Sequence, residues 1–194
     1  QLYSYQQDQL NRLTEQQVYR GLTGNVWSPT ATDDFKTQYT YDANGNLLTL
    51  LRNGNSVPGW NQEMDNLTYA YKPGTNQLLK VTDAVSASNY SQANNGTEDY
   101  DGPDPGVTTQ FTYDPIGNLT SDAAEGIQLI DWNVDGKIRD IVFDPNLATP
   151  KPGLSFLYDH AGNRVGKIVK EGAQEDEWTY TYYLAWWYLE ELSL

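Results

Sequence analysis

The side chains that most often carry out chemistry in proteins are scarce in this sequence. The chain contains no Cys and one His, His160, so Cys–His pairs and multi-histidine metal sites are excluded. A Ser-His-Asp triad would have to use His160, which lies in a predicted turn, and we expect a solvent-facing turn residue there. Asp and Glu are plentiful, and paired carboxylates could hydrolyse a glycosidic bond. An Asp recurs at the turn of each repeated motif described below, and we interpret it as a structural residue. We therefore expect no catalytic residue and no cofactor.

An acidic segment over residues 94–104 could gather oxygen ligands for calcium. Its sequence, Asn-Asn-Gly-Thr-Glu-Asp-Tyr-Asp-Gly-Pro-Asp, lacks the spacing of an EF-hand loop and the Glu that closes one. This composition is typical of a solvated loop. We therefore predict a loop and no metal site, with calcium binding as the open alternative.

Three stretches of the chain, residues 39–47, 111–119 and 156–164, repeat one pattern of residue types. An aromatic residue is followed by one residue, then Tyr-Asp, two further residues and Gly-Asn. An Asp at a strand end accepts hydrogen bonds from backbone N–H groups that follow it, and Gly tolerates positive φ, so each copy predicts a β-hairpin. The predicted turn residues are Asp42, Gly45, Asn46, Asp114, Gly117, Asn118, Asp159, Gly162 and Asn163.

Aromatic residues stand at alternate positions before the turns, and so share one face of a strand. They are Tyr39, Tyr41, Tyr69, Tyr71, Phe111, Tyr113, Trp132, Phe156 and Tyr158. Neighbouring hairpins could stack them into a ladder, in which each cross-strand aromatic contact contributes about 0.2–1 kcal/mol. Left exposed, the same rings could bind a glycan. We favour the ladder, because aromatic residues at a period of two usually mark the packed face of a strand.

Weaker copies fill most of the remaining chain. Residues 69–78 keep Tyr-x-Tyr and turn formers without the Asp, and residues 130–138 have Trp in place of Tyr and Asn in place of Asp. Residues 3–13 look like one copy stretched by two glutamines, and residues 178–182 begin a copy that never receives its turn. We therefore expect the repeats to cover residues 1–183.

Uneven spacing between the copies requires insertions in loops, which we place at residues 53–63, 84–106 and 144–153. The last of these holds three prolines, which cannot donate ladder hydrogen bonds and so belong outside a central strand. Residues 184–194, which include two adjacent Trp, depart from the pattern. This tail could plug the open end of a curved sheet, dock on a partner, or result from truncation.

These motifs resemble the YD repeat of RHS proteins, a family of large bacterial surface and secreted polypeptides with relatives among insecticidal toxin complexes and the teneurins. The resemblance implies an all-β fold: a curved antiparallel sheet of hairpins that forms part of a hollow shell, often around a C-terminal toxic domain. RHS proteins often carry a self-cleaving protease core with an Asp-Pro-x-Gly stretch. The stretch Asp114-Pro115-Ile116-Gly117 fits it superficially, but it lies in repeat context and we interpret it as a turn.

The charge of the chain argues against two classes of partner. The 194 residues carry 26 acidic and 12 basic side chains, for a formal net charge of −14, which disfavours nucleic acid and anionic membranes. No run approaches the roughly 18 apolar residues of a membrane span. The first residues also lack the basic start and apolar core of a signal peptide. A secreted protein would have lost its signal, or this chain is an internal piece.

The edge strands of such a sheet carry unpaired N–H and C=O groups, which favour pairing with another strand. The chain has too few hairpins for a full shell, so we expect it to belong to a larger RHS polypeptide or to pair with another chain through its sheet edges and its tail. The resemblance implies a non-enzymatic part of a secreted or cell-surface bacterial shell or scaffold that encloses or presents a toxin or other cargo. The alternative is a surface module that recognises a glycan or a protein through loops and exposed aromatic residues.

Overall fold

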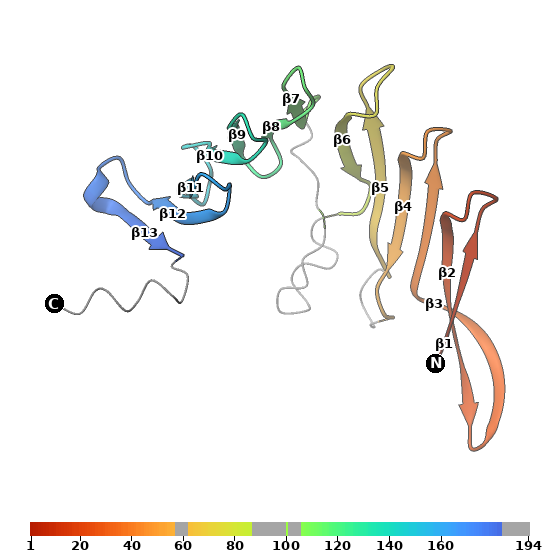
Figure 1. Ribbon diagram of the computed structural model, residues 1–194. Coiled ribbons are helices and arrows are strands. Elements are labelled where there is room, and N and C mark those ends of the chain that lie inside the picture. Colours follow the sequence, from red (N-terminus) through yellow and green to blue (C-terminus); the bar gives the residue numbers. More distant parts are fainter. Residues whose placement is uncertain (57–61, 87–99, 101–105, 184–194) are drawn as a thin grey trace. The chain divides into compact units, whose positions relative to one another are not determined.

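The computed structural model describes residues 1–56, 62–86, 100 and 106–183 (Figure 1). Strands dominate these residues, which include one 3₁₀ turn and no α-helix, so the predicted all-β class is confirmed. No helix of the described part is long and apolar enough to cross a membrane. The chain divides into two compact units, unit 1 (Gln1–Thr108) and unit 2 (Thr109–Leu194).

Unit 1 contains a six-stranded antiparallel sheet in which neighbours along the chain are neighbours in the sheet (Figure 1). Three hairpins, β1–β2, β3–β4 and β5–β6, make up this sheet, and their turns all lie at the same end of the strands. The strands are β1 (Leu2–Gln7), β2 (Leu13–Thr23), β3 (Val26–Tyr41), β4 (Leu47–Asn53), β5 (Glu63–Tyr71) and β6 (Leu78–Asp83).

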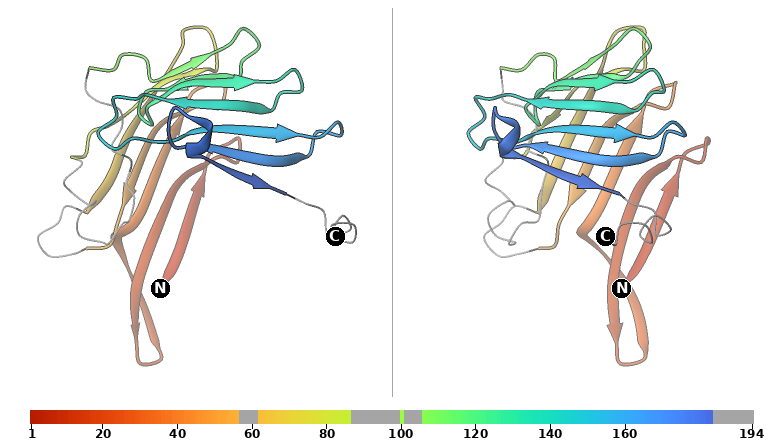
Figure 2. Two further views of the ribbon diagram at one scale, coloured as in Figure 1. Left: turned by 90° about the vertical axis from the view of Figure 1, so that its left-hand side faces the viewer. Right: turned by 60° about the vertical axis from the view of Figure 1, so that its left-hand side comes forward.

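Unit 2 contains a seven-stranded antiparallel sheet built in the same way (Figure 2). Its hairpins are β7–β8, β9–β10 and β11–β12, and β13 adds a last strand after the 3₁₀ turn Glu175–Glu177. The strands are β7 (Phe111–Tyr113), β8 (Leu119–Asp122), β9 (Ile127–Trp132), β10 (Ile138–Phe143), β11 (Gly153–Tyr158), β12 (Arg164–Lys170) and β13 (Trp178–Tyr182). The expected antiparallel hairpins are thus present, distributed over two sheets.

A β-bulge follows the turn in each of the six hairpins named above, but not in the connection between β2 and β3. In β3–β4, Thr40 pairs with Thr49 but Tyr41 pairs with Leu47, so the register skips Leu48. The other five hairpins skip one residue at the same place. The skipped residues are Thr14, Leu48, Leu79, Thr120, Arg139 and Val165. Because a bulge increases local twist and redirects side chains, the repeat specifies the end of each hairpin as well as its turn.

The first hairpin corrects one sequence interpretation. We expected the copy at residues 3–13 to be stretched by two glutamines, but both belong to β1, and Asp8 follows Gln7 directly, as Asp42 follows Tyr41. Gln7 therefore occupies the position of the second aromatic residue. The copy therefore has regular length.

The predicted insertions lie between strands except at three end residues, since Asn53, Glu63 and Gly153 belong to β4, β5 and β11. Described residues at the two ends of the 53–63 insertion contact Asp34, whose Oδ1 accepts hydrogen bonds from Ser56 N–H at 2.9 Å and Gln62 Nε2 at 2.8 Å. Asp34 Oδ2 also pairs with Arg20 at 2.7 Å. The segment with three prolines connects β10 to β11, and those prolines lie outside both strands. Residues 57–61, 87–99, 101–105 and 184–194 lie outside the described residues.

Few described apolar side chains are buried. They are Val18, Met64, Leu67 and Val81 in unit 1 and Ile130 in unit 2. The apolar face of a sheet normally packs against a second layer. In the described residues each unit has one sheet and no α-helix that could form a second layer. Most aromatic rings on the two sheets therefore remain half-buried.

Candidate functional site

The hairpin tips are built around one aspartate. In the β3–β4 tip, Asp42 Oδ1 accepts hydrogen bonds from Asn44 N–H at 2.9 Å and Asn46 N–H at 2.8 Å, and Oδ2 accepts one from Asn46 Nδ2 at 2.8 Å. The main chain closes the turn, because Asp42 N–H donates to the Asn46 carbonyl at 2.9 Å. Gly45 has a φ of 90°, a conformation that suits Gly.

The same contacts recur at the β7–β8 tip around Asp114 and at the β11–β12 tip around Asp159. The distances from the aspartate Oδ1 to its two backbone N–H donors range from 2.8 to 3.0 Å in these two tips. Gly117 and Gly162 have φ values of 98° and 80°. The structure therefore places all nine predicted turn residues at hairpin tips, where the three aspartates serve separate turns.

Hydrogen bonds hold the turn carboxylates in their charged form. The Asn46 side chain keeps the pKa of Asp42 below its usual value, and the Asn163 side chain does the same for Asp159. Partial desolvation acts to raise the pKa of Asp114, but hydrogen bonds from Asn118 outweigh it and the pKa is lowered. A carboxylate occupied in this way is a poor candidate for a general acid.

Three tips vary this design. At the β9–β10 tip, Asn133 Oδ1 accepts from Asp135 N–H at 3.0 Å and Lys137 N–H at 2.9 Å, so a neutral side chain supports the same turn. At the β1–β2 tip, Asn11 replaces Gly with a φ of 59°. The β5–β6 tip has no carboxylate and is one residue longer, since Lys72 N–H donates to the Gln77 carbonyl at 2.9 Å.

The aromatic residue before a turn ties its hairpin to the preceding one. The hydroxyl of a Tyr, or the indole N–H of a Trp, donates to a main-chain carbonyl of the preceding hairpin. The acceptor is the residue that begins the second strand of that preceding hairpin, and we call this contact the clamp. Four such clamps are Tyr41 to Leu13 at 2.8 Å, Tyr71 to Leu47 at 2.8 Å, Trp132 to Leu119 at 2.7 Å and Tyr158 to Ile138 at 2.8 Å.

The nine aromatic residues predicted for the ladder are all half-buried. They lie on the first strands of their hairpins, β3, β5, β7, β9 and β11. The more exposed aromatic side chains of the described residues lie on β1, on the part of β3 before Lys36, on β13 and directly after β13. They are Tyr3, Tyr5, Trp27, Phe35, Tyr180, Tyr182 and Tyr183.

Neighbouring tips also contact each other directly. Arg12 Nη1 donates to the Asp42 carbonyl at 3.0 Å and lies over the Tyr41 ring, 4.7 Å from its centroid. Asn46 Nδ2 donates to Asn76 Oδ1 at 2.9 Å. In unit 2, Lys137 Nζ donates to the carbonyl of Gly162 in the next tip. Arg12 and Lys137 both occupy the position of the turn Asn, so a longer cation there reaches the following hairpin.

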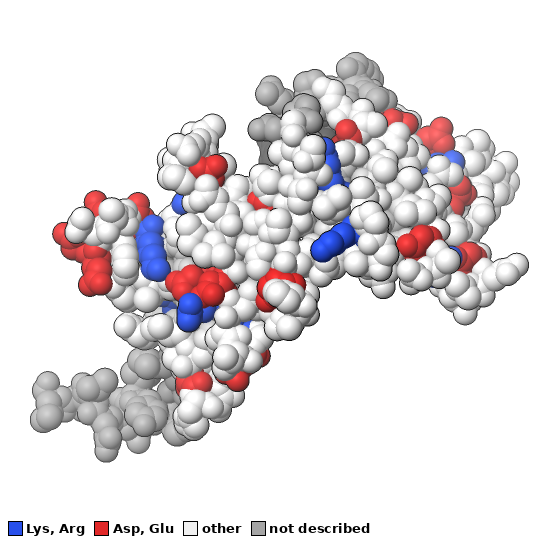
Figure 3. Space-filling model, turned by 90° about the horizontal axis from the view of Figure 1, so that it is seen from above, with Lys and Arg blue, Asp and Glu red and all other residues white. Residues whose placement is uncertain are grey.

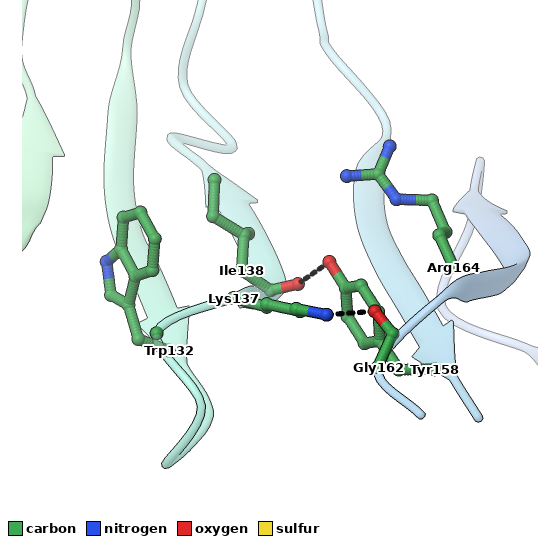
Figure 4. Close-up of a pocket in the computed structure, with 7 residues that line it drawn as sticks. Trp132, Lys137, Ile138, Tyr158, Gly162 and Arg164 are labelled. Atoms are coloured by element: carbon green, nitrogen blue, oxygen red, sulfur yellow. Dashed lines mark hydrogen bonds between the residues drawn. The ribbon is translucent and has the colours of Figure 1, made fainter. Parts of the chain in front are cut away.

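An open hollow of about 430 Å³ lies between the β9–β10 and β11–β12 tips of unit 2 (Figure 4). We call it the Tyr158 hollow. Its lining consists of Trp132, Gly136, Lys137, Ile138, Tyr158, Gly162 and Arg164. Lys137 Nζ lies 5.4 Å from the centroid of the Tyr158 ring, and the Arg164 guanidinium carbon lies 5.9 Å from it. Two cations thus approach one ring beside an indole.

The residues considered for chemistry in the sequence lie as follows. His160 is an exposed residue of the β11–β12 turn, and the Asp114-Pro115-Ile116-Gly117 stretch forms the β7–β8 turn. Within the described ranges, no group of three or more His, Cys, Asp or Glu could hold a metal ion. Apart from Tyr100, the acidic segment 94–104 lies outside those ranges, so calcium binding there stays an open question.

Sequence reasoning missed Arg12, Lys137 and Arg164. A signal for the first two was present, since each stands where other copies have Asn after the turn Gly or its replacement. Their significance depends on a ring in the next hairpin, 29 positions away for Arg12 and 21 for Lys137. No spacing within one copy reveals such a contact.

Charge on the surface matches the composition. On the face seen in Figure 3, acidic side chains are spread widely and basic side chains form a few separate patches. Seven of the basic side chains pair with a carboxylate of a described residue. Lys137 and Arg164 form no such pair within the described part of the chain.

Comparisons with known proteins give a likeness without a family assignment. No family profile matches the chain, and no curated protein matches it. Among solved structures, it is similar to part of the crystal structure of TcdB2-TccC3-TEV, with 18% identity and a TM-score of 0.37 over 94% of this chain and 11% of that chain. TcdB2-TccC3-Cdc42 gives 17% identity and a TM-score of 0.35 over 86% and 10%. The chain spans about a tenth of the length of both.

Proposed function

We propose that this chain is a non-enzymatic RHS/YD-repeat segment that forms part of a secreted or cell-surface β-shell or scaffold of a bacterium. In this proposal it encloses or presents a toxin or other cargo as one section of a longer polypeptide or assembly. The observation that carries the proposal is the clamp. Hairpins with the same bulge, five of them with the same turn, are joined side by side by aromatic residues that donate to the preceding hairpin.

The sheets support a role in a larger assembly, because in the described residues each has one layer and open edges. β1 and β13 each have one neighbouring strand there, and they carry Tyr5 and Tyr182 with exposed fractions of 59% and 62%. An exposed edge with aromatic residues favours pairing with another strand. Flanking repeats of a longer polypeptide, or a second chain, would cover both edges.

The state of the carboxylates supports a non-enzymatic role. The aspartates that recur in the sequence, Asp42, Asp114 and Asp159, are occupied by their own turns and lie in three different tips. Their pKa values are lowered, whereas a general acid needs a raised one. Carboxylates of this kind support a structural role better than a catalytic one.

Size-exclusion chromatography with light scattering tests the proposal on the isolated chain. We expect association above the monomer mass of 21.9 kDa, because the edges of both sheets are open. The association should decrease in a Tyr3→Lys/Tyr5→Lys variant of β1, since charged side chains block edge pairing. A clean monomer of both proteins over the whole concentration range would contradict the proposal.

A surface module that recognises a glycan or a protein is the second candidate function. The Tyr158 hollow favours it, because aromatic rings and unpaired cations meet there at the surface of unit 2. The predicted ladder residues outside this hollow are half-buried, and those of the clamps are occupied by their hydrogen bonds. Recognition would therefore involve the hollow rather than the whole aromatic face.

A further inference from the structure

The cations of the Tyr158 hollow form no ion pair with a carboxylate of the described residues. Acidic side chains outnumber basic ones by 26 to 12, and seven of the twelve basic side chains do have such a partner. Lys137 and Arg164 nevertheless approach the Tyr158 ring and not a carboxylate. The acid nearest to Arg164 along the chain, Asp159, accepts its hydrogen bonds from its own turn. Two positive charges near one ring favour the approach of an anion to this part of the surface.

The donors of both cations are available in the hollow. An ammonium group has three N–H donors, and Lys137 uses one for the Gly162 carbonyl (Figure 4). Arg164 is exposed, and its guanidinium stacks against Phe156 at 4.2 Å from the ring centroid. Stacking of this kind orients the planar fork of N–H groups, which matches the two oxygens of a carboxylate.

Trp132 gives the hollow an apolar wall. Its indole N–H is occupied by the Leu119 carbonyl at 2.7 Å, so the ring is held at the side of the hollow (Figure 4). The C–H groups of a pyranose ring pack well against such an aromatic surface. An oligosaccharide of acidic sugars would therefore offer carboxylates to the two cations and the face of a sugar ring to the indole.

We propose that the Tyr158 hollow binds an acidic sugar, with the carboxylate of a uronate held by Lys137 and Arg164 and the sugar ring packed against Trp132. This inference deepens the second candidate function and does not depend on the shell or scaffold role. The hollow is open, so binding is weak for one sugar and strengthened by neighbouring residues of an oligosaccharide. The net charge of −14 disfavours anions in general, so an anion needs a local group of cations such as Lys137 and Arg164.

The test uses NMR titration of the whole chain with tetragalacturonate as the probe, and with maltotetraose and acetate as separate arms. We expect shifts at the Trp132 indole and around Tyr158 with tetragalacturonate alone. Arg164→Gln should weaken this binding about tenfold, the typical effect of losing one charge-assisted hydrogen-bonded pair. Lys137→Gln should weaken it similarly.

Lys167→Gln is the matched control, because Lys167 lies on the same strand, has no carboxylate partner in the described residues and does not line the hollow. Its binding should remain within about twofold of the parent chain. An equal loss in this control would show a general charge effect and overturn the proposal. It would also be overturned by equal binding of maltotetraose, by acetate shifting the same signals at the same concentration, or by no shift with tetragalacturonate. The dispersed NMR spectrum reports the fold of each variant, and light scattering separately tests the scaffold proposal.

Discussion

The hydroxyl of Tyr41 donates a hydrogen bond to the main-chain carbonyl of Leu13, 2.8 Å away, and so joins the second hairpin to the first. Twenty-eight residues separate the two along the chain. The same relationship recurs between later hairpins in both units, with Trp replacing Tyr once. The aromatic ring at this position thus packs on its own sheet, while its hydroxyl or indole N–H donates a hydrogen bond to the preceding hairpin.

Removing one clamp hydroxyl should destabilise unit 1 without disturbing its packing. Tyr41→Phe leaves the ring in place and the Leu13 carbonyl without its donor, so the free energy of unfolding should fall by about 1 kcal/mol. Urea unfolding followed by circular dichroism measures the change. Tyr39→Phe is the matched control on the same strand, because no acceptor for its hydroxyl occurs among the described residues, and it should have a smaller effect. Equal effects of the two changes would contradict the role of the clamp.

The turn aspartate should be replaceable by Asn more easily than by Ala. Asn133 shows that an amide oxygen accepts both backbone N–H groups of the turn. Asp159→Asn should therefore lower the melting temperature slightly, and Asp159→Ala by about 5 °C, because Ala leaves two N–H groups and the Asn163 side chain without an acceptor. Thermal melts of both variants check this order. An equal loss in both variants would show that the charge, and not the acceptor geometry, supports the turn.

Stability should fall in acid as the turn carboxylates are protonated. The Asn46 and Asn163 side chains lower the pKa values of Asp42 and Asp159 from the ordinary 3.8, so the folded state binds a proton less readily than the unfolded chain. This contribution is fully present above pH 3.8 and is lost as the pH falls through the folded-state pKa values. Urea unfolding at several pH values between about 2 and 6 measures it. A free energy of unfolding that rises as the pH falls below 4 would contradict the assignment.

Two glycines of the outer β2–β3 hairpin should differ in their tolerance of Ala. Both have positive φ, 133° at Gly21 and 60° at Gly24. A Cβ at Gly24 meets open space, so Gly24→Ala should cost about 1 kcal/mol of backbone strain. A Cβ at Gly21 would collide with the main-chain oxygen of Ser28, so Gly21→Ala should open this part of the hairpin. Proteolytic cleavage between β2 and β3 measures the difference, and similar cleavage of both variants would contradict it.

The turns could be predicted from the sequence because their contacts are local. Asp42 reaches Asn44 and Asn46 within five residues, so the residue types alone specify the partners. The all-β class follows from the repetition of that turn between alternating aromatic residues. The copy around Asp8 was harder to align, because Gln7 replaces the aromatic residue that marks the end of the strand.

The clamps and the Tyr158 hollow could not be predicted in this way. Tyr158 donates to Ile138 across 20 residues, and the bulge beside the turn determines where its ring points. Arg164 follows a turn Asn, as Leu47 and Leu119 do, so its residue type alone did not indicate a site. The division of the strands into two sheets depends on long-range pairing, which one copy of the repeat does not contain.

Hydrogen exchange of the Trp132 indole N–H, followed by NMR, tests most directly whether hairpins are tied side by side into a wall. The account predicts slow exchange, because this N–H donates to the Leu119 carbonyl of the preceding hairpin at 2.7 Å. The Trp27 indole, which has no acceptor in the described part of the chain, is the internal reference and should exchange much faster. Exchange of the Trp132 indole as fast as that of Trp27, in a chain whose strand amides remain protected, would contradict the account.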